Sequence, residues 1–303
     1  MTFDPLLGLV AATHTPFDAS GDLHLPSVER QGEHLLAWGV TQVFIGGSTG
    51  ESASLGMVER LALAERWLEF ARGTALRVIV HVGGNCLRES AALAEQAQAL
   101  GARAVAMLSP SYFKPAAVDT LIACCAHVAA EAPDLPFYYY DIPSLTGVSL
   151  PMADFLAHGR EQIPNLAGLK WTNPDLYNFQ RCQHDAAGFD LLWGTDEALL
   201  AALAVGARGA VGSTYNFAAP LYHRLMAAFA AGDLAAARVE QYRSVQLVRT
   251  LVGYGFMGAA KAVMGMLGVP VGPARLPNTN PSPEQTAQLR ADLEAIGFFG
   301  WIA

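Results

Sequence analysis

The residue with the clearest chemical potential in this sequence is Lys170. The chain has 19 basic residues, and only three of them are lysines. Lys170 lies inside the apolar run 166–171, which has the length and composition of a buried strand. Because side chains alternate along a strand, Lys170 and Thr172 should face one side of it and Leu169 the other. A lysine is rarely buried without a partner or a task, so this position needs an explanation.

A buried lysine can act as a nucleophile. Burial disfavours the ammonium form and lowers the pKa of the amine from its ordinary value of about 10.4. The neutral amine can then attack a carbonyl carbon and form a Schiff base. The alternative is a lysine at the end of a strand whose ammonium group reaches water. The residues alone leave both explanations open.

A tyrosine at the end of another apolar segment has the chemistry of a proton relay. The segment 137–143 contains three consecutive tyrosines, and alternation places Tyr138 and Tyr140 on the same face. Tyr140 is the nearer of the two to the end of the strand. A phenol whose hydroxyl reaches the substrate can relay a proton. The alternative is that all three tyrosines are part of an aromatic core.

The turn 46–51, Gly-Gly-Ser-Thr-Gly-Glu, has the composition of an anion site. Glycines allow a sharp turn and a close approach to the backbone. Consecutive backbone N–H groups, together with the hydroxyls of Ser48 and Thr49, can hold a carboxylate. The turn is not a phosphate-binding P-loop, because no lysine follows its glycines.

All these residues lie at the ends of predicted strands. Short β-like runs alternate with amphipathic helical segments such as 57–72, 87–100, 118–131 and 221–230, which indicates βαβ units and a parallel sheet. Eight strands are expected, at 7–13, 42–46, 77–82, 104–108, 136–140, 166–171, 190–193 and 209–212. Eight units favour an α/β fold of the (β/α)₈ TIM-barrel type, although an open doubly wound sheet would give a similar alternation.

The pattern changes after the eighth unit. Segments 234–251, 258–267 and 283–296 have helical periodicity with no strand between them, and 268–281 reads as a loop rich in Pro, Gly and Asn. We therefore expect a catalytic barrel over 1–231 and a C-terminal helical extension over 232–303 packed on it. In such a barrel the chemistry lies in the loops that follow the strands.

The composition argues against several classes of protein. The net charge is −8 and no cluster of Lys or Arg offers a surface for nucleic acid. No apolar run reaches the roughly 18 residues of a membrane span, and the N-terminus lacks the pattern of a signal peptide, so we expect a cytoplasmic protein with no membrane partner. The four cysteines form no CxxC pair and are expected to be buried, inert thiols.

Four motifs, in this order and spacing, resemble one family. They are Gly47-Ser48-Thr49-Gly50-Glu51, Tyr140-Asp141-Ile142-Pro143 with Thr146-Gly147, Gly168-Leu169-Lys170, and Gly212-Ser213-Thr214. The chain is similar to the dihydrodipicolinate synthase / N-acetylneuraminate lyase superfamily of Schiff-base aldolases, from about residue 7 to the C-terminus. Within it, the stretches 135–140, 173–177 and 212–216 look like the lyase branch.

The resemblance implies a role for each site residue. Lys170 and Tyr140 would be catalytic, as Schiff-base lysine and proton relay. The residues implied to bind substrate are Ser48 and Thr49 for its carboxylate, Thr172 beside the Schiff base, Gly194, Asp196, Glu197 and Ser213 for a polyol tail, and Tyr112 in a hydrogen-bond chain with Ser48 and Tyr140. No metal or organic cofactor is implied, and the family is usually a homotetramer, built as a dimer of dimers.

The implied reaction is the reversible cleavage of N-acetylneuraminate to N-acetylmannosamine and pyruvate. Two positions bear on the substrate. Leu145 stands where dihydrodipicolinate synthases carry an arginine for a second carboxylate, and Asp141 stands where relatives carry His or Asn. Alternatives are an aldolase for another 2-keto-3-deoxy sugar acid, a dihydrodipicolinate synthase, a catalytically silent ligand-binding barrel, and a metal-dependent aldolase with His14, His81 or Asp196 as ligands.

Overall fold

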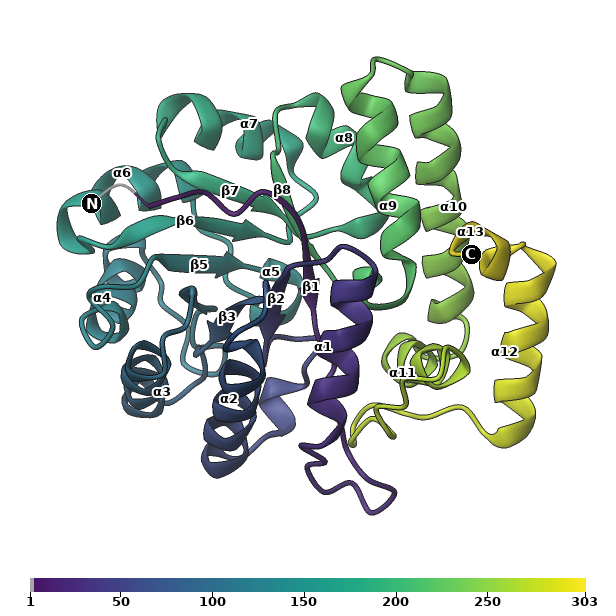
Figure 1. Ribbon diagram of the computed structural model, residues 1–303. Coiled ribbons are helices and arrows are strands. Elements are labelled where there is room, and N and C mark those ends of the chain that lie inside the picture. Colours follow the sequence, from purple (N-terminus) through teal and green to yellow (C-terminus); the bar gives the residue numbers. More distant parts are fainter. Residues whose placement is uncertain (1–2) are drawn as a thin grey trace.

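The computed structural model describes residues 3–303 and contains a closed barrel of eight parallel strands (Figure 1). β1 pairs with both β2 and β8, so the predicted barrel is confirmed and the open sheet is wrong. The strands are β1 (Gly8–Ala12), β2 (Gln42–Ile45), β3 (Arg77–His81), β4 (Ala104–Met107), β5 (Phe137–Asp141), β6 (Leu166–Trp171), β7 (Asp190–Trp193) and β8 (Gly209–Gly212). Each lies within two residues of its predicted bounds.

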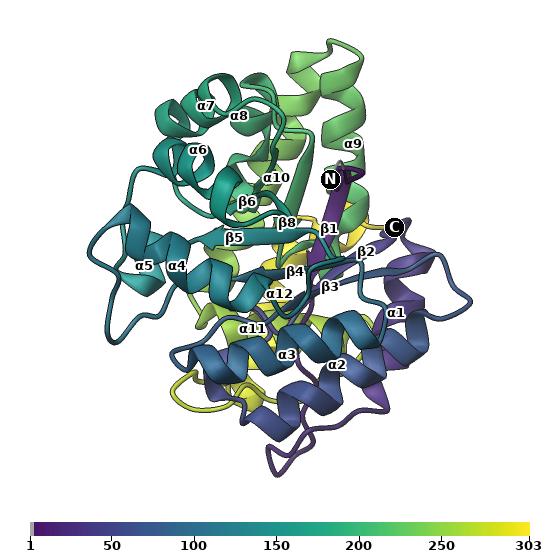
Figure 2. The same cartoon turned by 90° about the vertical axis from the view of Figure 1, so that its left-hand side faces the viewer.

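Helices surround the barrel on all sides, as Figures 1 and 2 show together. They are α1 (Ser27–Ala37), α2 (Met57–Ala71), α3 (Leu87–Ala99), α4 (Val118–Ala129), α5 (Pro143–Thr146), α6 (Met152–Gln162), α7 (Leu176–Asp185), α8 (Leu199–Ala204), α9 (Tyr215–Ala230), α10 (Leu234–Val252), α11 (Phe256–Met266), α12 (Pro283–Ala295) and α13 (Phe298–Trp301). Two 3₁₀ turns, Ser52–Ser54 and Asp196–Ala198, follow β2 and β7.

Alternation along the strands produces two separate cores. The larger one fills the space between strands and helices, and it takes Leu169 and Trp171 from β6 and Tyr139 from β5. The smaller one fills the barrel itself and takes Tyr138 and Tyr140. Since each strand is buried on both faces, the sequence reads as short continuous apolar runs.

The helices α10 to α13 form the C-terminal extension on one side of the barrel (Figure 1). α10 packs along α9, and α11 and α12 pack against α10. Local signals set the start of α12: the Ser282 side chain accepts the amide of Gln285, and Pro283 occupies the first turn. The predicted boundary at 231/232 falls in the turn between α9 and α10; that it separates two domains stays a prediction.

One helix differs from its prediction. α9 begins at Tyr215 and not at Leu221, with a non-helical residue at Ala218 and a proline at 220. Two residues of the polar stretch 213–216, which resembles a loop, instead form the buried start of this helix, namely Tyr215 and Asn216. Asn216 donates from Nδ2 to the carbonyls of Ala12 and Ser213, and so ties the helix to β1.

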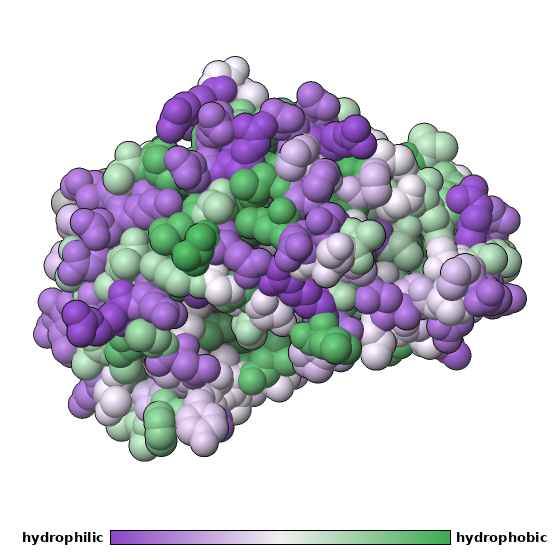
Figure 3. Space-filling model, turned by 90° about the horizontal axis from the view of Figure 1, so that it is seen from below, coloured by the Kyte–Doolittle hydropathy of each residue, from purple (hydrophilic) through white to green (hydrophobic). Residues whose placement is uncertain are grey.

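The surface carries hydrophobic residues in separate small patches among hydrophilic ones on the face seen in Figure 3. Within residues 3–303, no helix has the length and hydropathy needed to span a membrane. The cysteines follow the prediction only in part: Cys125 and Cys182 are buried, Cys124 is partly buried, and Cys86 is exposed.

Candidate active site

Lys170 lies in the interior of the barrel on β6, paired in register with Tyr140 of β5. The residue is 4% exposed, so a lysine whose amine reaches bulk water is excluded. Its Nζ lies 3.7 Å from the centre of the Tyr140 ring and 4.1 Å from that of Phe44. Burial lowers the pKa of Lys170, although Tyr140 and the Asp196 carboxylate act in the opposite direction. The side chain therefore has the environment that the nucleophile hypothesis requires.

The three consecutive tyrosines of β5 have three different environments. Tyr140 points into the barrel beside Lys170, and its hydroxyl lies 3.3 Å from the Ser48 hydroxyl. Tyr138 points to the same interior but one layer deeper, and donates to Asp190. Tyr139 faces the helices and packs against Phe155. Only Tyr140 is both interior and at the rim, so it is the tyrosine that can exchange a proton with a substrate bound at Lys170.

The turn 46–51 presents free backbone donors at this rim. Its conformation is closed by the Glu51 amide, which donates to the Ser48 carbonyl over 3.0 Å. Among the hydrogen bonds of residues 3–303, the amides of Ser48 and Thr49 donate to no protein acceptor. Thr49 Oγ1 lies 2.6 Å from Ser213 Oγ, which links the turn to the end of β8. Two adjacent free N–H groups with two hydroxyls suit a carboxylate.

His81, at the end of β3, supports the turn 46–51 through its first residue, Gly46. Its Nδ1 lies 2.8 Å from the Gly46 carbonyl, and the Leu108 amide donates to Nε2 over 3.4 Å. A carbonyl only accepts and an amide only donates, so the ring is neutral with its proton on Nδ1. Burial lowers the pKa of His81 well below its ordinary value. From the sequence, His81 is expected only as a possible metal ligand. Its support of the turn 46–51 is indicated only by its place at the end of a predicted strand, two residues before Gly83-Gly84.

The ends of β6 and β7 meet beside the lysine. Thr172 lies two residues beyond Lys170, and its Oγ1 is buried without a hydrogen-bond partner in the part of the chain described. Gly194 follows β7 directly, and a Cβ at this position would come within 2.0 Å of Thr172 Oγ1. Glycine is therefore required at 194 for the Thr172 hydroxyl to keep its place.

The carboxylates of Asp196 and Glu197 have different surroundings. Asp196 is 6% exposed, and its Oδ2 accepts from the Thr214 amide and hydroxyl over 2.8 and 2.6 Å. Burial raises the pKa of Asp196 to about 6. Glu197 is exposed at the surface. The two side chains therefore do not form a matched pair, and only Asp196 is electrostatically coupled to Lys170.

The structure does not bring Tyr112 to Ser48 and Tyr140 within one chain. Tyr112 is 77% exposed, and its ring packs edge-on against Phe113. In residues 3–303 its hydroxyl has no hydrogen-bond partner, whereas the Ser48–Tyr140 contact of the expected chain is present. Leu145 is exposed as well, at 64%.

Asp141 follows Tyr140 but does not share its environment. It continues the outward-facing series of Phe137 and Tyr139, and it is 1% exposed. Its Oδ2 accepts from Asn173 Nδ2 over 3.0 Å. Burial raises the pKa of Asp141 to about 6. Asp141 therefore lies behind the strand and away from the side on which Lys170 and Tyr140 meet.

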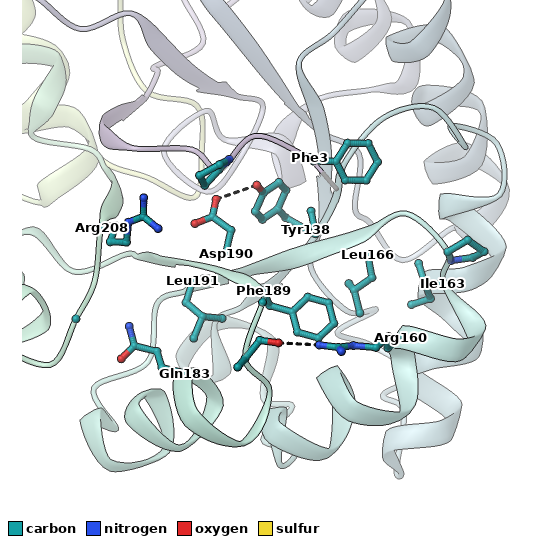
Figure 4. A pocket seen from close by; sticks show the side chains of 16 residues that line it. Phe3, Tyr138, Arg160, Ile163, Leu166, Gln183, Phe189, Asp190, Leu191 and Arg208 are labelled. Carbon is teal, nitrogen blue, oxygen red and sulfur yellow. Dashed lines mark hydrogen bonds between the residues drawn. The ribbon is translucent and has the colours of Figure 1, made fainter. Parts of the chain in front are cut away.

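A pocket of about 670 Å³ lies at the opposite end of the barrel, where strands begin (Figure 4). Its lining includes Tyr138, Asp190 and Arg208. Tyr138 and the Leu6 amide both donate to Asp190 Oδ2, over 2.9 and 2.7 Å, and these bonds tie the N-terminal segment across the barrel floor. Chemistry in such barrels lies at the other rim, so we assign this pocket to the closure of the fold.

The alternative of a metal-dependent aldolase requires a cluster of metal-ligating side chains, and the described residues contain none. His14 and His81 are both buried, and His81 uses both ring nitrogens within the protein. Over residues 3–303, no three His, Cys, Asp or Glu side chains are grouped so that they could hold a metal ion.

Comparison with known proteins gives one consistent result. The profile of the Dihydrodipicolinate synthetase family matches residues 5–296. The N-acetylneuraminate lyase of Gallus gallus is 42% identical over 296 residues, covering 96% of this chain and 96% of that protein. The N-acetylneuraminate lyase structure from Proteus mirabilis has a TM-score of 0.94 at 39% identity, covering 97% of this chain and 100% of that one. The N-acetylneuraminate lyase (sialic acid aldolase) from Aliivibrio salmonicida has a TM-score of 0.94 at 38% identity, covering 98% of each.

Proposed function

Because the chain belongs to the dihydrodipicolinate synthetase family, we propose that it is a Schiff-base aldolase that cleaves N-acetylneuraminate reversibly to N-acetylmannosamine and pyruvate. One observation carries this proposal: the buried amine of Lys170 lies against the Tyr140 ring, at the rim where Ser48 and Thr49 offer free amides. Relatives of about 40% identity with the name N-acetylneuraminate lyase support the choice of substrate.

The proposed mechanism begins with attack of the Lys170 amine on C2 of the open-chain 2-keto acid. The carbonyl oxygen leaves as water, and a protonated imine forms. The amides and hydroxyls of Ser48 and Thr49 hold the neighbouring carboxylate. As the C3–C4 bond breaks, its electron pair moves into the imine, and Tyr140 takes up the C4 hydroxyl proton. The Ser48 hydroxyl lies 3.3 Å from the Tyr140 hydroxyl, so a proton can pass between the two. The proton then returns through Tyr140 to C3 of the enamine that cleavage has left, which restores the protonated imine. Hydrolysis of this imine releases pyruvate and the free Lys170 amine.

The remaining site residues are proposed to bind the rest of the substrate. The unpartnered Thr172 hydroxyl is suited to the region beside the Schiff base. Gly194, Asp196, Glu197 and Ser213 would form the polyol site, in which carboxylate oxygens accept from sugar hydroxyls. The exposed Leu145 offers no donor for a second carboxylate, and this favours an uncharged aldehyde over aspartate semialdehyde as the partner of pyruvate.

The proposal includes a homotetramer built as a dimer of dimers in the cytoplasm. Tyr112 and Phe113 are 77% and 85% exposed in the single chain, which is unusual for adjacent aromatic residues and suits a surface covered by a second copy. In that assembly, the Tyr112 that completes the Ser48–Tyr140 chain would come from a neighbouring copy. The four free thiols of the described chain suit a reducing compartment.

The test combines trapping with a substrate panel. Pyruvate and borohydride should give a covalent adduct that maps to Lys170 by mass spectrometry, and Lys170→Ala should lose both adduct and activity. Wild-type protein should release pyruvate from N-acetylneuraminate faster than from shorter 2-keto-3-deoxy sugar acids. An adduct at Lys114 or Lys261 would overturn the mechanism. Faster condensation of pyruvate with aspartate semialdehyde would overturn the substrate assignment alone.

A further inference from the structure

We infer that Glu51 and Lys261 are positioning residues for substrate binding: through their ion pair, the C-terminal extension holds the turn 46–51 in the shape that binds the substrate carboxylate. This inference rests on the proposed function, in which Ser48 and Thr49 receive that carboxylate. It concerns how the turn is held, which the proposed mechanism leaves open.

The ion pair joins two distant parts of the chain inside the protein. Lys261 Nζ on α11 lies 2.7 Å from Glu51 Oε1, and the two side chains are 1% and 0% exposed. The same Nζ donates to the carbonyls of Thr15 and Pro273, over 2.9 and 2.8 Å. Two of the three ammonium donors of Lys261 are thus used by backbone carbonyls, beside the ion pair with Glu51. Lys261 is thus the second buried lysine of the chain, and it is held by two carbonyls and a carboxylate, whereas the Lys170 amine lies over the rings of Phe44 and Tyr140.

The second oxygen of Glu51 is also held by the extension. Its Oε2 accepts from the Arg275 amide over 2.8 Å and from Asn278 Nδ2 over 3.2 Å. Glu51 therefore contacts both α11 and the loop between α11 and α12. Arg275 in turn donates to Glu59 on α2, which fixes this loop to the barrel independently.

The backbone at Glu51 needs such support. Its φ is +54°, and within residues 3–303 it is the one non-glycine residue with positive φ. L-residues seldom adopt this conformation, and glutamate has no short side chain that favours it. Gly50, the preceding residue, is also held in place. Thr15 Oγ1 donates to the Gly50 carbonyl over 2.5 Å, and Lys261 Nζ donates to the Thr15 carbonyl.

These contacts of Glu51 affect the amides of Ser48 and Thr49 that would donate to the substrate carboxylate. Glu51 is two residues from Thr49, and its amide closes the turn by donating to the Ser48 carbonyl. A relaxation of Glu51 toward negative φ would therefore rotate the peptide planes of Ser48 and Thr49. Misplacement of a positioning group by about 1 Å can cost on the order of 100-fold in rate or affinity.

A buried ion pair could also serve stability alone, and a matched control separates the two roles. Glu240 on α10 is likewise held by two charged partners, Arg224 and Arg243, and its side chain is 11% exposed. It lies in the same extension without any contact to the turn. We compare Glu51→Gln with Glu240→Gln by trapping Lys170 with borohydride over a range of pyruvate concentrations. Hydroxyacetone, a ketone that lacks the carboxylate, is the second probe.

The expected result is specific to the carboxylate. Glu51→Gln should raise the half-saturating pyruvate concentration about 10- to 100-fold, with little change in the limiting rate and none in hydroxyacetone trapping. Glu240→Gln should leave both probes unchanged. Equal effects of the two variants, or equal losses with both ketones, would overturn the inference while the proposed function stands. Absence of any pyruvate adduct at Lys170 in the wild type would overturn the proposed function and the inference with it.

A milder variant covers the case in which Glu51→Gln does not fold. Asn278 is only partly buried and makes one of the bonds to Glu51, so Asn278→Ala should fold. Loss of that one bond should raise the half-saturating pyruvate concentration roughly 2- to 10-fold. An unchanged value would count against the positioning role.

Discussion

Replacing Asp141 by asparagine should change how the free energy of unfolding depends on pH. Asp141 is 1% exposed, accepts one hydrogen bond from Asn173, and has a pKa raised by burial from 3.8 to about 6. Each pH unit between those values is worth about 1.4 kcal/mol, so the whole interval corresponds to about 3 kcal/mol. This is an upper bound, because water that enters the site on ionisation would reduce it.

The sign follows from which state holds the proton more tightly. Between pH 3.8 and about 6 the folded protein keeps the Asp141 proton while the unfolded chain has lost it. The contribution of Asp141 to the free energy of unfolding is therefore fully present below pH 3.8, and it is lost as the pH rises through about 6. The asparagine side chain of the Asp141→Asn variant stays neutral at every pH. The variant should therefore gain up to about 3 kcal/mol relative to wild type between pH 4 and pH 7.

The assay is equilibrium unfolding in urea at pH 4 to 8, at one fixed protein concentration. The amide group introduced by Asp141→Asn adds a buried donor, which costs about 1–3 kcal/mol if it finds no acceptor, but this cost is the same at every pH. The difference between variant and wild type should therefore rise with pH whatever its absolute value. Asp175→Asn is the control, because the pKa of Asp175 is lowered by hydrogen bonds from Asn178 and it loses stability only on acidification. A variant-minus-wild-type difference that is constant over pH 4 to 8 would refute the reasoning.

Three further outcomes concern the site. Tyr140→Phe keeps the ring beside Lys170 and deletes the hydroxyl, so kcat should fall about 10²- to 10⁴-fold while borohydride trapping with pyruvate persists; unchanged kcat would mean that Tyr140 only packs. Gly194→Ala puts a Cβ within 2.0 Å of Thr172 Oγ1 and should lower kcat/KM on the order of 100-fold. Gly265→Ala, which meets no atom within 4 Å, should not change kcat/KM, and equal rates for these two alanine variants would contradict the steric argument. Asp196→Ala should lower kcat/KM for N-acetylneuraminate roughly 10- to 150-fold and affect pyruvate trapping much less; equal losses in both would place its role at the Schiff base.

The barrel was predictable because its determinants are local. Each strand is a short and mostly apolar run that is largely buried on both faces, and the predicted bounds of β6 and β7 match the observed ones. Period-two alternation also gave the inward position of Lys170 and Tyr140. The same rule applied to β5 turns Asp141 outward, away from the side that Tyr140 faces, although the two residues are adjacent in the sequence.

The supports of the site were not predictable, because their partners are far apart in the sequence. Lys261 meets Glu51 only when the extension packs on the barrel, and no spacing rule links residues 51 and 261. His81 contacts Gly46 across neighbouring strands in the same way. For Lys261, one signal existed: it interrupts the apolar and small residues of α11, just as Lys170 interrupts β6. The start of α9 was not predicted because its polar residue Asn216 is buried, with a hydrogen bond to the Ala12 carbonyl of β1.

The contact between Glu51 and the extension also sets when the turn can be completed during synthesis. Arg275, whose amide holds the Glu51 carboxylate, follows it by 224 residues. At about 5–20 residues per second, a ribosome needs roughly 10 to 45 s to cover that distance. All eight strands are synthesised before Lys261, Arg275 and Asn278, the partners of Glu51 in α11 and the following loop. A nascent barrel therefore carries Lys170 and Tyr140 before the turn 46–51 is supported. If Glu51 has the positioning role that we infer, the last part of the chain decides when the enzyme becomes able to hold its substrate.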